Sequence, residues 1–168
     1  FKHLDKMKAL EVLKISNTGV RGQGMQFFKR KKSDTGLRIL DASHSQFGHA
    51  GLQFLKNVET LEELDLSQAE VSDRALLGLK GITHLKKLNL GFNQITDQGL
   101  TVLSTTKGLE KIYLRNNAMV GDFTLKNLAK NKELAFLDIN GTSSTIGGVT
   151  SLKKLLPNCE ILFMGATH

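Results

Sequence analysis

The chain has 168 residues, of which 40% are hydrophobic and 23% charged, a balance typical of one globular domain and not of a disordered chain. Its longest apolar stretches are far shorter than the ~20 residues that span a bilayer, so no membrane insertion is expected. The net charge of +7 is concentrated at one end, because residues 1–36 carry nine basic and three acidic side chains.

The basic end contains the run Lys29, Arg30, Lys31 and Lys32. A nucleic-acid groove usually shows a basic stripe along the molecule, so nucleic acid is not the expected partner. The run falls where the first full repeat of the chain, defined below, is three residues longer than its neighbours. We expect a solvated loop there, and the alternative is a contact with an acidic partner or a phosphate.

Cys159 is the single cysteine, so it cannot form an internal disulfide or, by itself, a metal site. The absence of disulfide pairs favours a reducing, cytoplasmic compartment. The histidines lack the i, i+4 spacing and third ligand of a metal site, and no P-loop ending follows the glycines near residue 20. We therefore expect no metal and no cofactor.

An internal repeat dominates the sequence, and residues 85–103 provide its template. Apolar residues fall at offsets 0, 3, 5, 10, 15 and 18 from the first residue, with Asn at offset 8 and Gly at offset 14. The template recurs from Leu10, Leu37, Leu61, Leu85, Leu109, Leu134 and Cys159. This predicts about six repeats starting at 10, 37, 61, 85, 109 and 134, with a partial repeat at each end, in one domain that is a fragment of a longer chain.

Two apolar columns define a short strand in each repeat. Offset 3 is occupied by Leu13, Leu40, Leu64, Leu88, Ile112, Leu137 and Leu162, and offset 5 by Ile15, Ala42, Leu66, Leu90, Leu114, Ile139 and Met164. Side chains two residues apart in a strand share one face, so both columns are expected to point inward. Offsets 15 and 18, such as Leu100 and Leu103, have helical spacing and predict a helix packed on the same core.

Polar residues mark the joints of each repeat. Ser72/Asp73 and Thr96/Asp97 stand where a helix N-terminus needs side-chain acceptors. Offset 8 holds Asn93 and Asn117 but Ala69 in the third repeat, so we expect an inward hydrogen-bond ladder that is imperfect near Ala69.

These columns resemble the leucine-rich-repeat family over essentially the whole chain. The phrase from Ile95 to Leu100 is similar to the ribonuclease-inhibitor-like and F-box-associated classes, and residues 155–161 resemble the closing repeats of bacterial members. The resemblance implies an α/β solenoid, curved and right-handed, with a parallel sheet on its concave face and helices on its convex face. It also implies that the concave face binds a protein.

The outward strand positions contain an aromatic and arginine cluster. We predict a partner-binding site formed by Tyr113, Arg115, Phe92 and Phe136, surrounded by Asp65, Asn89, Lys87, Lys111 and Asp138, because exposed aromatics with arginine have the composition of interface hot spots. The alternative is that Phe92 turns inward and Phe136 is covered by its neighbours.

Catalysis is not expected. Asp41, Ser43 and His44 have the residue types of a triad, but no nucleophile elbow or oxyanion hole accompanies them. The sequence favours a non-catalytic protein-interaction module, acting as a monomer. The alternatives are the substrate-recognition part of a larger enzyme (ubiquitin ligase-like or kinase-associated), anionic-polymer binding through the basic end, and a structural spacer.

Overall fold

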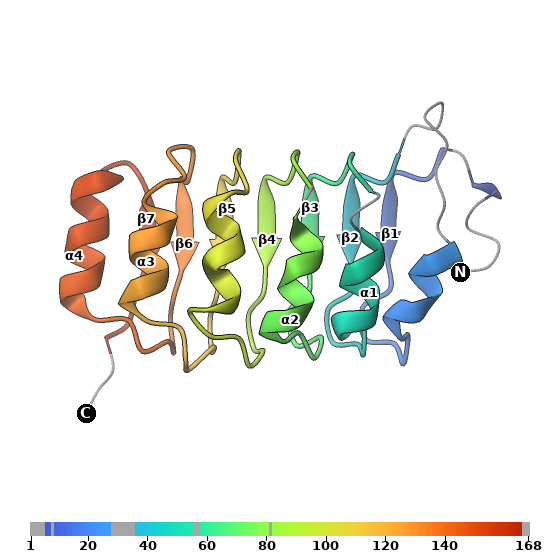
Figure 1. Ribbon diagram of the computed structural model, residues 1–168, viewed down its shortest axis with the longest axis horizontal. Coiled ribbons are helices and arrows are strands. Elements are labelled where there is room, and N and C mark those ends of the chain that lie inside the picture. The colour runs from blue at the N-terminus through green and yellow to red at the C-terminus, as the bar shows by residue number, and fades with distance from the viewer. Residues whose placement is uncertain (1–5, 8, 28–35, 56–57, 81, 166–168) are drawn as a thin grey trace.

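A computed structural model describes residues 6–7, 9–27, 36–55, 58–80 and 82–165. Seven parallel strands form one sheet whose order follows the chain from β1 to β7 (Figure 1). The strands are β1 (Val12–Lys14), β2 (Ile39–Asp41), β3 (Glu63–Asp65), β4 (Lys87–Asn89), β5 (Lys111–Tyr113), β6 (Phe136–Asp138) and β7 (Glu160–Leu162). Each strand therefore contacts only the strands of the preceding and the following repeat, as expected for a solenoid.

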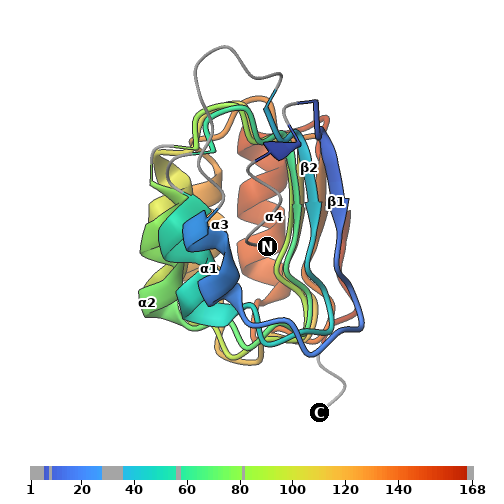
Figure 2. The same cartoon turned by 90° about the vertical axis from the view of Figure 1, so that its right-hand side faces the viewer.

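Helical segments form a second layer that covers one face of the sheet and leaves the other face open (Figure 2). They include the α-helices α1 (Gly48–Leu55), α2 (Asp73–Leu76), α3 (Asp122–Leu128) and α4 (Ile146–Leu155), and the 3₁₀ helices η2 (Gly22–Phe27), η3 (Leu77–Leu79) and η4 (Gly99–Ser104). The expected α/β repeat architecture is confirmed. Several helices are only one or two turns long, because the chain must leave one strand, form the helix and reach the next strand within about 24 residues.

The core lies between the two layers. Leu40, Leu64, Leu88, Ile112 and Leu137 occupy equivalent places in adjacent strands, and each is at most 1% exposed. From the helix side, Leu52/Leu55, Leu76/Leu79 and Leu100/Leu103 are buried against them. Both predicted apolar sets therefore contribute to one continuous core that extends from Met25 to Cys159.

The last strand differs from the expectation. Ile161, not Leu162, pairs with Leu137, and Ile161 and Phe163 pack against the core. Leu162 and Met164 point outward, with 39% and 67% of their surface exposed. The placement of Leu162 and Met164 in the inward columns was wrong.

One residue fewer between Cys159 and the strand explains this difference. Cys159 keeps the first buried position of its repeat, where its N–H donates to the carbonyl of Leu156. The next residue, Glu160, already pairs with Phe136, whereas Leu134 and Phe136 are two residues apart. A shift of one residue moves every side chain of a strand to the opposite face.

Buried asparagines join adjacent repeats through the backbone. Asn117 is fully buried; its Nδ2 donates to the carbonyls of Leu90 and Leu114, both at 2.9 Å, and its Oδ1 accepts from the N–H of Ile95 at 3.2 Å. At the same offset, the hydroxyl of Thr142 reaches the carbonyl of Ile139 in its own repeat (2.8 Å). The asparagine therefore bonds to the backbone of two repeats, whereas the threonine bonds only to the backbone of its own repeat.

The ladder changes at Ala69 as expected. Ala69 has no side-chain donor or acceptor to bond to the preceding repeat, whereas Asn93 of the next repeat bonds back to the repeat of Ala69 much as Asn117 bonds back to the repeat of Asn93. The Oδ1 atom of Asn93 accepts from the N–H groups of Ala69 (3.2 Å) and Val71 (2.9 Å), and its Nδ2 donates to the carbonyl of Leu66 (2.9 Å).

Aspartates make a second set of bonds between repeats on the helix side. Asp73 accepts from the N–H (2.8 Å) and the hydroxyl (2.6 Å) of Thr96 in the following repeat, and Asp122 accepts in the same way from Thr145. Ser72 makes no side-chain cap bond to its own helix. Glycine is required at Gly99 because a Cβ there would overlap the Asp73 carboxylate.

We expect Asn117→Ala to lower the free energy of unfolding by about 3 kcal/mol, because several buried backbone groups lose their partner. Thr142→Ala, at the same offset, should cost only about 1 kcal/mol. Urea unfolding followed by circular dichroism measures both values. Equal losses in the two variants would contradict the role of asparagine as the bridge between repeats.

The corrected register of β7 predicts opposite effects at neighbouring residues. Ile161→Asp places a carboxylate against the core and should cost about 2 kcal/mol of stability. Leu162→Asp, on the outward face, should change stability by less than about 0.5 kcal/mol. Thermal unfolding of the two variants distinguishes the registers. A larger loss of stability in Leu162→Asp than in Ile161→Asp would support the register in which Leu162 points inward.

Candidate binding site on the strand face

Tyr113 and Phe136 form a half-buried aromatic pair on the open face of the sheet. They belong to adjacent strands, β5 and β6, and their ring centroids are 5.1 Å apart with an interplanar angle of 40°. This geometry lies within the favourable range for aromatic contacts. Phe136 is thus partly covered by Tyr113, but both rings keep accessible surface.

Two exposed cations flank the aromatic pair. Lys111 lies directly beside Phe136 in the sheet register, and Arg115 follows Tyr113 by two residues on the same strand face. The ion pairs of the described residues include neither Lys111 nor Arg115. Lys87 differs, because its Nζ lies 3.5 Å from the Glu63 carboxylate. That exposed pair is worth about 0–1 kcal/mol.

The expected polar surround has a different role. Asp65 Oδ1 accepts from the N–H (2.9 Å) and the hydroxyl (2.7 Å) of Ser67, and Asp65 Oδ2 accepts from Asn89 Nδ2 (2.9 Å). Asp138 is only 7% exposed, and its Oδ1 accepts from the N–H of Asn140 (3.0 Å). These side chains brace the turns after the strands, so Asp138 is not an accessible member of the site.

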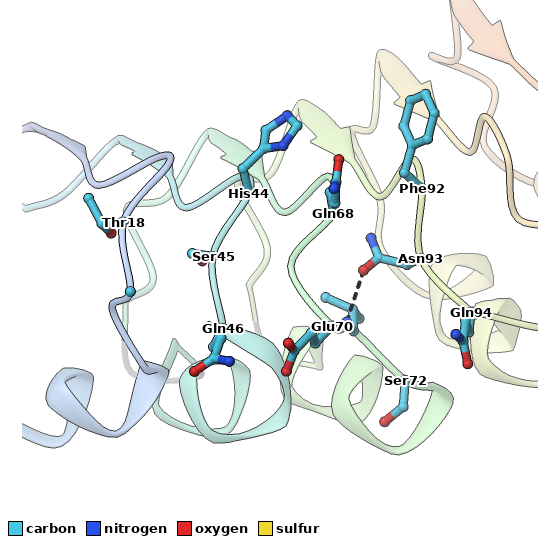
Figure 3. A pocket seen from close by; sticks show the side chains of 12 residues that line it. Thr18, His44, Ser45, Gln46, Gln68, Glu70, Ser72, Phe92, Asn93 and Gln94 are labelled. Carbon is cyan, nitrogen blue, oxygen red and sulfur yellow. Dashed lines mark hydrogen bonds between the residues drawn. The ribbon is translucent and has the colours of Figure 1, made fainter.

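Phe92 is exposed, and the alternative that it turns inward is wrong. Its side chain is 52% exposed, and its backbone adopts a left-handed conformation with φ of 57°. The Phe92 N–H donates to the carbonyl of Arg115 (2.7 Å). Phe92 therefore lies beside the aromatic and cationic cluster, but its ring projects from the loop after β4, alongside His44 and Gln68 (Figure 3).

Two apolar residues that the sequence pattern assigned to the core extend the open face. Leu162 pairs with Asp138 in the register of β7, and the N–H of Met164 donates to Asn140 Oδ1 (2.6 Å). The run Ile161 to Met164 is apolar on both alternating faces, so hydrophobicity alone could not choose between the two registers. Leu162 and Met164 thus add apolar surface to the open face at β7, with Asp138 between Tyr113 and Leu162 in the sheet register.

The three residues with the types of a triad do not assemble as one. The hydroxyl of Ser43 donates to Asp41 Oδ1 (2.7 Å), and so does the Ser43 N–H (3.1 Å). The His44 ring projects from a backbone with φ of 50° into the loop region shown in Figure 3. The Asp41–Ser43 contact repeats the turn-bracing contact of Asp65 and Ser67, which explains both residues structurally.

Hydrogen bonding shifts the titration of Asp41. Partial burial raises its pKa, but the hydrogen bonds from the hydroxyl and N–H of Ser43 and from Ser16, together with the charge of Lys14, lower the pKa below the ordinary aspartate value. A lowered folded-state pKa contributes stability above the unfolded value of about 4, and this contribution is lost as pH falls through the folded value.

The remaining expectations concern charge, metal and membrane. The basic run Lys29, Arg30, Lys31 and Lys32 lies outside the described residues. Within the described parts of the chain, no group of three or more His, Cys, Asp or Glu side chains is arranged to hold a metal ion. Their helices likewise include none with the length and apolar character needed to cross a bilayer.

Comparisons with known proteins agree with this architecture. Residues 81–104 match the sequence family described as a leucine-rich repeat, and no curated protein matches the chain. Internalin C2 of Listeria monocytogenes is 22% identical with a TM-score of 0.64, over 98% of this chain and 76% of its own. Internalin F of the same organism is 25% identical with a TM-score of 0.60, over 79% of this chain and 36% of its own.

The seven stacked strands, the buried columns and the match of residues 81–104 give the chain the fold of a leucine-rich-repeat solenoid. In proteins of this architecture each repeat contributes a few side chains to one continuous surface. The open strand face is that surface here.

We expect Ser43→Ala to raise the pKa of Asp41 toward its ordinary value, because the mutation removes one of the donors that stabilise the carboxylate. The variant should also lose less stability than the wild type when the pH falls from about 6 to about 3. Carboxyl ¹³C NMR titration and urea unfolding at the two pH values measure these effects. Ser151→Ala, an exposed serine change on α4, should leave the Asp41 titration unaltered.

Proposed function

We propose that this chain is a non-catalytic interaction module that binds a protein partner on the strand face between β4 and β7. The observation that carries the proposal is the Tyr113–Phe136 pair, with ring centroids 5.1 Å apart, between two cations and the outward residues Leu162 and Met164. Folding alone does not require large apolar side chains at these outward positions, since the core is complete beneath them.

The composition of this face fits protein recognition. Tyrosine and arginine are enriched among residues that contribute most to binding, and such residues act best where a partner can exclude water from them. A partner that covered the exposed parts of both rings, together with Leu162 and Met164, would remove apolar surface from water. This burial stabilises a complex by about 25 cal/mol per Å².

The charges specify the complementary partner. Lys111 and Arg115 carry positive charge without an ion pair among the described residues, and Asp65 and Asp138 are engaged in turn bracing. Glu160, which pairs with Phe136 in the sheet register, is an exposed carboxylate on the same face. A partner with carboxylates placed around an apolar anchor would complement this pattern, and charge complementarity of this kind favours specificity and association rate.

The repeat architecture supports the binding role, because a solenoid presents one extended surface to which successive repeats contribute side chains. The use of Ser43 and Asp41 in turn bracing supports the non-catalytic part of the proposal. The alternative of anionic-polymer binding depends on Lys29, Arg30, Lys31 and Lys32, which lie outside the described residues. The alternative of substrate recognition within a larger enzyme would use the same strand face.

The test compares two double variants as baits in native lysate. Tyr113→Ala/Arg115→Ala removes one ring and one cation from the strand face. Phe123→Ala/Lys126→Ala removes the same kinds of group from exposed positions on α3. We expect a prey that binds the wild type and the α3 variant but not the strand-face variant.

Titration of the purified prey completes the test. The strand-face variant should bind at least about 30-fold more weakly, as expected when a hot-spot side chain worth 2 kcal/mol or more is lost. The strand-face variant should unfold about 2–4 °C below the wild type, because Tyr113→Ala removes a half-buried aromatic contact, and it should be fully folded at the temperature of the titration. Preys retained by the strand-face variant and released by modest salt would contradict the proposal.

A further inference from the structure

A groove follows the loops after strands β1 to β4, on the side of the turn that leads toward the helices (Figure 3). Its volume is about 800 Å³, within the usual range of ligand sites. His44, Gln68 and Phe92 form one wall, while Gln46, Glu70 and Gln94 form the other. Each wall thus takes one side chain from each of three successive repeats, about 4.8 Å apart.

The backbone of the first wall is left-handed in every repeat. The positive-φ residues at this place are Asn17, His44, Gln68, Phe92, Asn116 and Gly141. Asparagine and glycine tolerate this conformation, and histidine is also enriched there, but glutamine and phenylalanine are not favoured. Asn17, Asn116 and Gly141 do not line the groove, whereas His44, Gln68 and Phe92 do.

The residues that line the groove therefore include side chains that the backbone conformation disfavours. Phe92 gains little burial in return, because its side chain is 52% exposed. Glu70, on the opposite wall, is also left-handed, with φ of 56°. The left-handed turn itself is part of the repeat, since its N–H donates to the following repeat at His44, Gln68 and Phe92. The choice of glutamine and an exposed phenylalanine there, where Asn116 and Gly141 form the same turn, is the observation that points to a ligand.

The chemistry of the groove favours an uncharged polar ligand. Its lining contains no lysine or arginine and a single carboxylate, that of Glu70, so an anionic ligand finds no counter-charge. The nearby Arg21 donates to Gln46 Oε1 (3.1 Å) and is not a lining residue. The amides of Gln46, Gln68 and Gln94 can each donate and accept hydrogen bonds, as sugar hydroxyls also do.

An extended peptide suits the groove less well. Peptides that add a strand need unpaired backbone groups. Here the N–H groups of His44, Gln68 and Phe92 donate to Ser67, Gly91 and Arg115, and the N–H of Val71 donates to Asn93 Oδ1. Recognition must therefore rely on side chains: amides that read hydroxyls and an aromatic ring that covers an apolar face.

We propose that the groove binds a neutral oligosaccharide. The amide groups of Gln68 and Gln94 hydrogen-bond the sugar hydroxyls, and the Phe92 ring packs against the C–H face of one sugar ring. Because the walls repeat with the solenoid, the ligand lies across the repeats, with successive sugars contacting successive loops. This site is separate from the aromatic pair of the strand face.

The test uses cellohexaose, maltohexaose and chitohexaose as probes, with a heparin hexasaccharide as the anionic counterpart. Titrations are followed by ¹⁵N NMR of the full chain. We expect at least one neutral probe to shift the side-chain amide signals of Gln68 and Gln94, with a dissociation constant of about 1 mM or lower. Failure of all three neutral probes, or binding of heparin alone, would overturn the proposal.

Phe92→Asn separates ligand binding from folding, because it installs the residue that Asn116 provides at the equivalent place. Relief of the left-handed strain should raise the unfolding midpoint by about 2–4 °C, while oligosaccharide affinity falls about tenfold or more. Phe123→Ala, at an exposed phenylalanine on α3, should bind as the wild type. Unchanged affinity in Phe92→Asn, or a lower midpoint, would show that Phe92 is not kept for this ligand.

Discussion

The inability of a single repeat to bury its own apolar side chains governs this structure. Leu40, Leu64, Leu88, Ile112 and Leu137 are covered only because each repeat lies between two others. Asn93 and Asn117 fix that stacking, since each amide bonds to the backbone of the preceding repeat as well as its own. On the other side of the core, Asp73 and Asp122 join the helical turns. Backbone hydrogen-bonding groups of one repeat thus find their partners in side chains of the adjacent repeat.

The same stacking produces the two candidate surfaces. Aligned strands place outward residues side by side, so that Tyr113 meets Phe136 and Lys111 lies beside both. Aligned turns place His44, Gln68 and Phe92 in a second row along the loops. The strand face combines apolar area with positive charge, which suits a protein surface, whereas the loop groove is polar and nearly uncharged. One constraint on packing therefore yields surfaces with different chemistry.

The candidate site could be predicted in part. The period-two pattern placed Tyr113, Arg115 and Phe136 on the outward face, and the structure locates them there. It could not show that Asp65 and Asp138 are consumed by turn bracing, because that depends on the position of Ser67 and Asn140 in three dimensions. Leu162 and Met164 were missed for another reason. One residue fewer after Cys159 reverses the faces of β7, and an apolar run on both faces hides that change.

The sequence by itself determined the repeat, the strand columns and the buried asparagines, because these follow from a spacing that is regular along the chain. Only the tertiary structure decided which polar side chains are free and which are engaged. It also decided the orientation of Phe92 and of the last strand. Those properties depend on the register of each strand and on the conformation of the turn after it, which decide contacts within a repeat, such as Asp65 with Ser67, and between repeats, such as Asp65 with Asn89. Neither the register nor the turn conformation alters the pattern of residue types along the chain.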